Sequence, residues 1–413
     1  MQIVSRCCCG LDVHKRVIVG CLLSIDSEGV ETREVRKFGT MTEELLGLLD
    51  WLEKSGCTHV AMESTGVYWK PVYNILEGHI EQVMVVNAQH LKAVPGRKTD
   101  VRDSEWIAEL LQHGLLKASF VPPAPVRELR DLTRYRSTLI RERARTTNRL
   151  QKVLEDANIK LGNVVSDIKG VSASAMLRAL VAGHTDPEIL ACLAKGRMRE
   201  KREQLVKALT GRLKPHHRFL IAEHLSQIDY LDEAVQRISD QIGERLRPFD
   251  DAIEKLDEVP GISRRTAEVL LAEIGWDMSR FPTAKNLASW AGMCPGNNES
   301  AGKRHSGKTR KGSPWLRHAL VEAAHGAVHT KNKYYKAQYN RIATRRGKKK
   351  ALLAVGHSLL IVVYQLLTRG TSYEDLGANH FDERDREAVQ RRCVKRLERL
   401  GYTVSLSPVS QAA

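Results

Sequence analysis

RCCCGLDVHKRVIVGCLLSIDSEGVETREVRKF, residues 6–38, determines the architecture of the first part of this chain. It contains three runs rich in apolar and β-branched residues, at 6–13, 16–24 and 30–38, and short turns such as DSEG at 26–29 join them. Runs of this length bounded by turn residues are typical of β-strands. The sequence therefore predicts a three-stranded meander.

Further elements follow the meander at regular intervals. Hydrophobic spacing predicts alternating helices and strands at 42–54, 59–62, 67–77, 82–86 and 99–113. Thr99 is a candidate N-cap for the last helix, whose first turn carries Asp100 and Asp103. The resulting order, βββαβαβα, predicts an α/β domain over residues 1–123.

The VPPAP segment at 121–125 separates this domain from the rest of the chain, because consecutive prolines cannot continue a helix. Residues 127–160 then show the pattern of a long helix with an imperfect coiled-coil seam, in which Arg136 and Arg143 replace apolar residues. We expect a helical coiled-coil linker over 124–250, a mostly helical domain over 251–370 and a tail over 371–413. The predicted fold class is therefore α/β followed by all-α.

The composition describes a folded and strongly basic protein. Lys and Arg number 65 against 49 Asp and Glu in 413 residues, which gives a net charge of +16 and predicts a polyanionic partner. Eight cysteines without a CxxC pair argue against a zinc ribbon and a disulfide framework. No secretory signal is recognisable, and the apolar run 351–367 is short and contains polar residues, so we expect a cytoplasmic protein without a membrane span.

Four carboxylates of the α/β domain are candidate metal ligands: Asp12 in GLDVHK, Glu63 in MESTG, and Asp100 and Asp103 in KTDVRD. Asp12 lies in an apolar strand, where a charge is costly unless it binds something. Glu63 ends another strand, and Asp100 and Asp103 share one helix face. Each alone is compatible with a capping or helix-dipole role. The joint pattern on this order of elements indicates two Mg²⁺ ions, or alternatively Mn²⁺, for phosphoryl transfer, and it matches the ribonuclease-H-like arrangement of RuvC-type nucleases.

A glycine-rich loop with basic surroundings lies at 294–312, CPGNNESAGKRHSGKTRKG. Between Ser300 and Tyr373, 16 Lys or Arg stand against the single acid Glu322, which suits DNA or RNA phosphates. The long helix adds eight Arg between 127 and 149, for which a solvated charged face is the alternative reading. The expected phosphate contacts are Lys303, Arg304, Lys308, Arg310, Lys311, Arg134, Arg141 and Arg145.

The carboxylate set and the PGNNESAGK segment together resemble the insertion-sequence 110 family of DEDD transposases, over nearly the whole chain. The resemblance implies that a serine of this loop is the nucleophile, Ser300 by motif, with Ser306 as the nearby alternative. It also implies an RNA-guided recombinase of a bacterial or archaeal cell, in which a structured non-coding RNA (bridge RNA) pairs with donor and target DNA. A site shared between subunits would require a homodimer, and a complex of two duplexes suggests a tetramer.

The residues themselves leave the reaction open. Serine needs a base or a metal to become a nucleophile, and no His or carboxylate lies at a fixed local spacing from Ser300. A covalent phosphoserine would conserve the phosphodiester energy, and the lack of a GxxxxGK[ST] motif agrees with a reaction without a nucleotide cofactor. Two alternatives stand beside the recombinase: a RuvC-like structure-selective nuclease that uses metal-activated water, and a non-catalytic protein that binds guide RNA and DNA.

Overall fold

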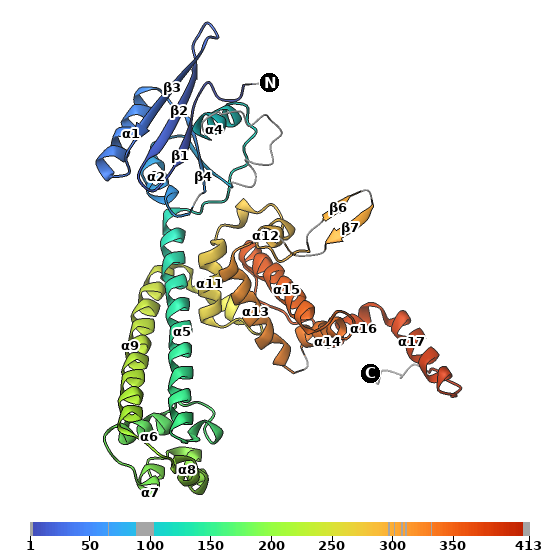
Figure 1. Cartoon of the computed structure of the whole chain (residues 1–413). Coiled ribbons are helices and arrows are strands. Elements are labelled where there is room, and N and C mark those ends of the chain that lie inside the picture. The colour runs from blue at the N-terminus through green and yellow to red at the C-terminus, as the bar shows by residue number, and fades with distance from the viewer. Residues whose placement is uncertain are drawn as a thin grey trace. The chain divides into compact units, whose positions relative to one another are not determined.

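The computed structural model describes residues 3–64, 66–87, 103–295, 298–300, 302–306, 309, 312–331 and 333–407. The chain forms two compact units, Met1–Pro122 and Pro123–Ala413, and the division falls within the VPPAP segment. Figure 1 traces the elements of each unit. The first unit is a sheet with helices, and the second is mostly helical.

Five strands form the sheet of the first unit: β1 (Cys7–Val13), β2 (Ile18–Ile25), β3 (Glu31–Phe38), β4 (His59–Glu63) and β5 (Gln82–Val86). Their order across the sheet is β3-β2-β1-β4-β5. β1, β2 and β3 pair antiparallel, which confirms the predicted meander, while β4 pairs parallel to β1 and β5 parallel to β4. β2 begins two residues later than the pattern predicts, because the N–H of His14 donates to the carbonyl of Val17 and closes a turn.

Helices cover both faces of this sheet. α1 (Thr42–Lys54) and α2 (Trp69–Leu76) pack on one face, around the fully buried Leu48. α4 (Asp103–Gln112) packs on the other face, over the fully buried Cys8. All eight cysteines are free thiols, and Cys8 is a small residue of the core.

The second unit begins with a hairpin of two long helices, α5 (Ala124–Asp156) and α9 (Pro215–Leu246), which lie side by side in Figure 1. Arg143 pairs with Asp232 and Arg136 contacts Ser239, so residue numbers rise along one helix as they fall along the other. The two helices are therefore antiparallel, and they pack against each other within the chain.

Short helices close the tip of this hairpin around a core of their own, which contains the fully buried Leu161 and Leu205. They are η1 (Leu161–Asn163), α6 (Val171–Val181), α7 (Pro187–Ala191), η2 (Gly196–Lys201) and α8 (Arg202–Leu209). We refer to α5, α9 and these tip helices as the arm.

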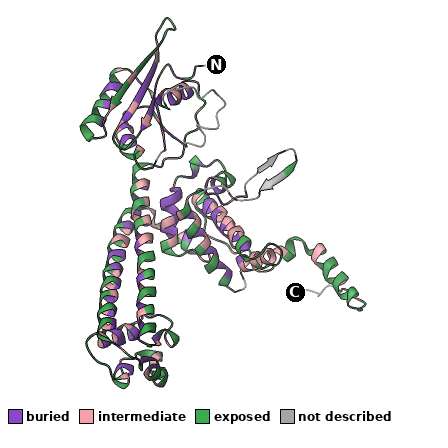
Figure 2. Ribbon diagram, viewed as in Figure 1, coloured by how far each residue is buried: buried purple, intermediate pink, exposed green. Residues whose placement is uncertain are grey.

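The remaining helices form a bundle from which a two-stranded hairpin, β6 (Asn298–Ser300) and β7 (Lys303–Ser306), projects between α12 and α13. Figure 2 shows buried residues concentrated in α11, α13 and α15. The bundle helices are η3 (Arg247–Phe249), α10 (Asp250–Asp257), α11 (Arg264–Ile274), η4 (Met278–Arg280), α12 (Ala284–Trp290), α13 (Pro314–His329), α14 (Tyr334–Arg346), α15 (Lys348–Arg369), α16 (His380–Arg384) and α17 (Arg386–Arg399).

Among the described residues, α15 alone is long and apolar enough to cross a membrane, by length and composition. It packs against α10, α12, α13 and α14 within the bundle. Val355, Leu359 and Leu360 are fully buried in these contacts. These are the contacts of a helix in the core of the bundle.

Candidate active site

Strand alternation sends Asp12 and Glu63 to the same face of the sheet. On β1, Leu11 belongs to the core beneath α1 and α2, whereas Cys8 belongs to the core beneath α4. Asp12 lies four residues from Cys8 and therefore shares the α4 face. On β4, Ala61 lies beneath α4, and Glu63, two residues further on, shares that face as well.

The register of the sheet brings these two carboxylates to adjacent positions. The pairing of β1 with β4 places Leu11 opposite Met62, so Asp12 and Glu63 are the next residues along two neighbouring parallel strands. Such strands run about 4.8 Å apart. The Asp12 side chain is 23% exposed, and its Oδ2 lies 3.0 Å from Nε2 of His14. Asp12 is thus accessible and held in orientation by a hydrogen bond.

Gly10 allows α4 to approach the same face closely. A Cβ at this position would stand less than 3.0 Å from the carbonyl oxygen of Ser104 and the amide nitrogen of Ala108. Ser104 is fully buried in this contact, and Asp103 precedes it as the exposed first residue of α4. The absence of a side chain at residue 10 therefore fixes where Asp103 stands relative to the strand that carries Asp12.

Three of the four expected metal ligands thus belong to one face of the sheet, and Asp100 lies outside the described residues. The ligand atoms of Asp12, Glu63 and Asp103 do not form a group within 4.8 Å of one another. Carboxylate oxygens are nevertheless the hard ligands that Mg²⁺ and Mn²⁺ prefer. The ligand atoms of these carboxylates are therefore of the chemical type that such an ion binds.

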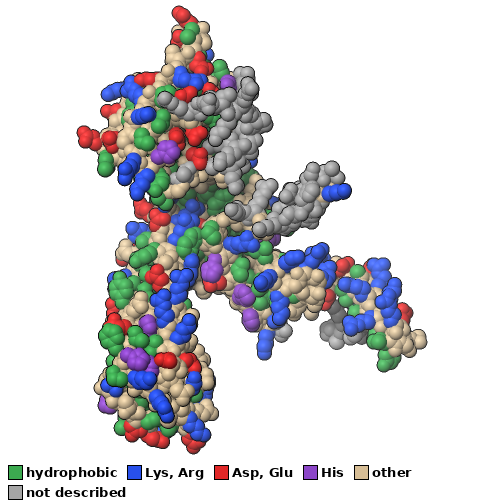
Figure 3. Space-filling view, viewed as in Figure 1, with side chains coloured by type: hydrophobic (Ala, Val, Ile, Leu, Met, Phe, Trp, Pro, Cys, Tyr) green, Lys and Arg blue, Asp and Glu red, His purple; other side chains and the backbone are tan. Residues whose placement is uncertain are grey.

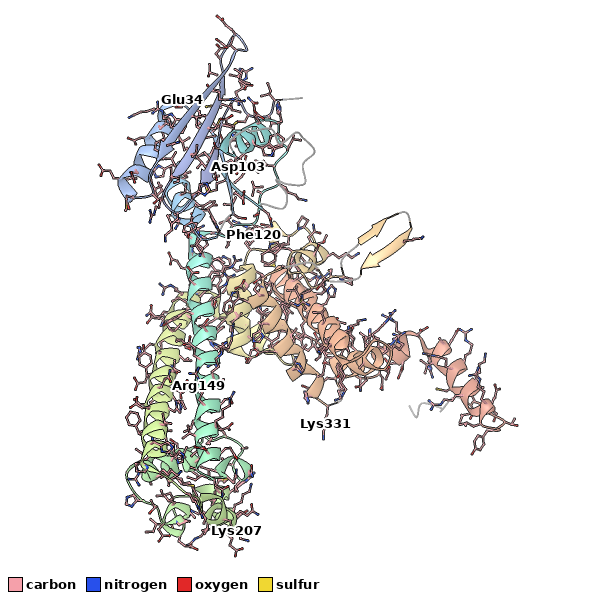
Figure 4. All side chains as sticks on the ribbon, viewed as in Figure 1. Glu34, Asp103, Phe120, Arg149, Lys207 and Lys331 are labelled. Atoms are coloured by element: carbon pink, nitrogen blue, oxygen red, sulfur yellow. The ribbon has the colours of Figure 1, made fainter. Side chains whose placement is uncertain are left out.

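The predicted nucleophile lies on the hairpin of the second unit (Figure 4 shows this hairpin as a ribbon). Ser300 ends β6 and is paired with Lys303 of β7, whose side chain is exposed. Arg304 is paired with Glu299, and the alternative serine, Ser306, with Asn298. Of the other expected phosphate contacts in this loop, Lys308, Arg310 and Lys311 lie outside the described residues.

The two ends of the hairpin loop meet at a closed base. Pro295 and Thr309 form an antiparallel bridge, and Oγ1 of Thr309 accepts a hydrogen bond from Nη1 of Arg317 at 3.0 Å. Gly312 packs directly on the backbone of Ala291, where a Cβ would not fit. The serine-bearing hairpin is therefore held by backbone contacts at its base.

Two family models match this chain, one over its first part and one within the helical bundle. A model described as a transposase, of the DEDD type of IS110 elements, matches residues 9–159 and includes the sheet with its carboxylates. A second, described as the transposase IS116/IS110/IS902 family, matches residues 253–340 and includes the hairpin with Ser300. The chain belongs to the insertion-sequence 110 family of transposases. It is accordingly an enzyme that acts on DNA.

Individual relatives agree with this assignment. A probable family 20 transposase of Pseudomonas aeruginosa is 25% identical over 322 residues, which is 76% of this chain and 85% of the relative. The transposase for insertion sequence element IS1328 of Yersinia enterocolitica is 26% identical over 326 residues, with the same two shares. A pilin gene-inverting protein of Moraxella bovis is 27% identical over 194 residues, 40% of this chain and 58% of the relative.

A buried carboxylate anchors the hairpin base of the transposase to its arm. Glu273, whose side chain is 1% exposed, accepts hydrogen bonds from Nε and Nη2 of Arg134 at 2.7 and 2.9 Å. It also accepts one at 2.8 Å from Oγ of Ser313, the N-cap of α13. Arg130 donates to the carbonyl of Ala272 at 3.0 Å, and burial lowers the pKa of Arg130 to about 10. Arg134, an expected phosphate contact, is thus bonded within the protein.

Sequence reasoning missed this network of the transposase. Its signal is the presence of Glu268 and Glu273 in the otherwise apolar segment 267–274 of α11. Glu268 accepts a hydrogen bond at 2.6 Å from Arg136, one of the two arginines that interrupt the coiled-coil seam. A buried carboxylate in an apolar segment is costly unless it is paired, so it predicts a cation from elsewhere in the fold.

One further cluster of the transposase, at the tip of the arm, has the composition of a metal site. The ligand atoms of Asp156, His216 and His217 lie within 4.8 Å of one another. Nδ1 of His217 accepts the N–H of Lys214 at 3.2 Å, so its Nε2 carries the proton and donates to Asp156 at 2.8 Å. If Nε2 bound a metal, the ring proton would have to lie on Nδ1. The Nδ1–H of His217 and the N–H of Lys214 would then face each other without an acceptor. The geometry is that of a helix cap.

Proposed function

We propose that this transposase is a site-specific recombinase that cuts and rejoins DNA through a covalent phosphoserine at Ser300. Its Mg²⁺ would be held by Asp12, Glu63, Asp100 and Asp103. The observation that carries the proposal is that Asp12 and Glu63 occupy adjacent positions on parallel strands, on the face where Asp103 begins α4. The strand order β3-β2-β1-β4-β5 supports a ribonuclease-H-like, RuvC-like domain.

The chemistry is an exchange of esters at phosphorus. The Ser300 hydroxyl would lose its proton to a base, form a P–O bond to the DNA phosphate and release one DNA alcohol. A second DNA alcohol would then attack the phosphoserine and release the serine. Each step replaces one phosphoester bond by another, so no nucleotide cofactor is required. Lys303, paired with Ser300 in the hairpin, would stabilise the negative charge that develops on the phosphate.

The carboxylates of the first unit supply oxygen ligands on rigid elements. With a divalent ion bound, these residues would supply charge stabilisation at the reacting phosphate. Asp12 and Glu63 are fixed by the register of the two strands, and Asp103 is fixed by the packing of α4 on Gly10. The hydrogen bond between Asp12 and His14 orients the first of these carboxylates.

The partners follow from charge and from the relatives. A net charge of +16 supports binding of nucleic acid. A relative named a pilin gene-inverting protein supports site-specific rearrangement, since gene inversion requires strands to be both cut and rejoined. We further propose a structured bridge RNA as the guide, a homodimer or homotetramer as the active form, and action in the cytoplasm.

A denaturing gel for covalent protein–DNA adducts tests the proposal. Full-length protein is incubated with Mg²⁺, the non-coding RNA that flanks its gene, and labelled donor and target DNA. Ser300→Ala is compared with Ser306→Ala, the matched control in the same hairpin, and with Asp12→Asn. We expect an adduct with the wild type and Ser306→Ala, and none with Ser300→Ala or Asp12→Asn.

Three other results would contradict the proposal in different ways. An adduct that is lost only in Ser306→Ala would move the nucleophile to that residue. Cleaved DNA without an adduct, unaffected by Ser300→Ala and abolished by Asp12→Asn, would identify a nuclease that uses metal-activated water. Binding of RNA and DNA with no cleavage under any condition would identify a non-catalytic binding protein.

A further inference from the structure

Seven of the eight arginines of α5 fall into two groups with different surroundings. Four of them point into the protein and are bonded there. Arg134 is bonded to Glu273, Arg136 to Glu268 and Arg143 to Asp232, while Arg130 donates to backbone carbonyls of α11. These four guanidinium groups are already bonded within the protein.

A second group stays on the surface. Arg141, Arg145 and Arg149 follow one another at intervals of four residues, and Lys152 continues the row; all four are exposed. Four residues correspond to about 6 Å of helix, so the row extends over about 16 Å along α5. We call these four residues the cationic row. Figure 3 shows basic side chains along this part of the arm.

The members of the cationic row lie outside the buried sector of α5. At 100° per residue, they fall within one sector of about 80°. The residues of α5 that are buried along the same stretch, Leu139, Thr146, Leu150 and Leu154, centre on the opposite side of the helix. Asp232 of α9 is paired with Arg143 and not with a member of the row.

No described carboxylate neutralises the row. Arg145, Arg149 and Lys152 take part in none of the ion pairs among the residues that the structure describes. The charge of Arg149 even helps burial to lower the pKa of His224 on α9. Like charges four residues apart on a helix destabilise it. Repulsion within the cationic row therefore lowers the stability of the free protein, and a bound polyanion would remove this repulsion.

One end of the row is joined to the base of the serine hairpin. The guanidinium of Arg141 lies 4.4 Å from the centre of the Trp315 ring, in the first turn of α13. Trp315 is two residues beyond Ser313, the N-cap that is bonded to Glu273. The row therefore begins beside α13, the helix that follows the serine hairpin.

We propose that the cationic row of α5 binds the phosphodiester backbone of a nucleic-acid duplex. The row would give affinity and direction without reading sequence, because phosphate contacts carry no base information. This role is separate from strand cleavage. It extends the nucleic-acid surface of the transposase from the hairpin onto the arm.

The test is equilibrium binding of the full-length protein to a labelled 30-bp DNA duplex of arbitrary sequence, over a series of salt concentrations. EDTA is present throughout, so the outcome does not depend on the metal site or on Ser300. The row variant is Arg145→Gln/Arg149→Gln/Lys152→Gln, with Arg141 retained because it packs on Trp315. The matched control, Lys195→Gln/Arg197→Gln/Lys207→Gln, removes three exposed cations at the tip of the same arm.

Loss of three phosphate contacts should reduce the slope of log K against log [salt] by about 2.7 and weaken binding at 50 mM salt by about tenfold or more. The control variant should keep the wild-type slope. The row variant should melt at or slightly above the wild-type temperature, because the like-charge repulsion is removed.

An RNA duplex of the same sequence identifies the source of the phosphates. A reduced slope with both duplexes, or with the RNA duplex alone, supports the row as a phosphodiester site and says which nucleic acid it serves. An unchanged slope with both duplexes would overturn the proposal. An equal reduction in the control would also overturn it, because net charge rather than the row would then account for binding.

Discussion

The substitution Gly10→Ala tests whether the packing of α4 on β1 controls the carboxylate site. The new Cβ would stand within 3.0 Å of backbone atoms of Ser104 and Ala108, which cannot rotate away. An ordinary contact needs 3.4 Å or more, so α4 must move outward by about 1 Å, because the interior is already close-packed. Overpacking of this kind should lower the free energy of unfolding by about 1–3 kcal/mol.

The same movement displaces a candidate metal ligand. Asp103 is the first residue of α4, so a shift of the helix by about 1 Å carries it away from Asp12 and Glu63. A misplacement of this size costs about 100-fold in rate when reacting groups must be aligned. We therefore expect Mg²⁺-dependent DNA cleavage by Gly10→Ala to fall by about two orders of magnitude, measured well below its melting temperature.

Gly47→Ala is the matched control, because it makes the same chemical change in the same unit. Gly47 lies within α1, and a Cβ there meets nothing within 4 Å. Alanine should raise stability by about 1 kcal/mol through helix propensity and leave cleavage unchanged. Gly10→Ala with a wild-type cleavage rate would refute the link between α4 and the site, and Gly10→Ala with wild-type stability would refute the packing argument itself.

Three further predictions concern other parts of the molecule. Glu273→Ala leaves the Arg134 guanidinium without its carboxylate and should cost about 3–5 kcal/mol in urea unfolding, whereas Glu273→Met/Arg134→Met should cost less than Glu273→Ala; equal costs would contradict a paired network. Burial lowers the pKa of His357 below its usual 6.5, so the unfolded chain takes up a proton at higher pH than the folded one. The contribution of the neutral His357 to the free energy of unfolding is complete above pH 6.5 and is lost as the pH falls below that value. His357→Gln should reduce the change in melting temperature between pH 7 and pH 5. A pH profile equal to that of the wild type would contradict this role of His357. EDTA should abolish cleavage, and added Mg²⁺ or Mn²⁺ should restore it; cleavage that persists in EDTA would exclude a metal role for Asp12.

Much of the first unit could be predicted from local patterns. The meander over residues 6–38 is encoded by short β-type runs and tight turns, which act over a few residues. The partner of the long α5 helix could not be predicted in the same way. Arg136 and Arg143 interrupt the coiled-coil seam in the sequence, yet Glu268 and Asp232, which bind them, lie about 90 to 130 residues further along the chain. Only the fold brings such partners together.

The candidate site also has a part that could be predicted from the sequence and a part that could not. Strand ends and helix starts can be located from the sequence, so Asp12, Glu63 and Asp103 could be proposed together. Their common face depends on the register between β1 and β4 and on the space above Gly10, which the sequence does not display. The phosphate role of Arg134 was proposed from charge alone, and its bond to the buried Glu273 depends on tertiary packing.

The closed base of the serine hairpin has a consequence for how such enzymes diversify. Because Pro295 meets Thr309 and Gly312 rests on Ala291, the chain leaves and re-enters the helical bundle at a single point. Doubling the length of a flexible loop between fixed ends adds only about 0.6 kcal/mol of closure entropy. Insertions or exchanges between these two anchor points would therefore leave the helices undisturbed, and the hairpin can be replaced as a cassette while the scaffold that presents it stays the same.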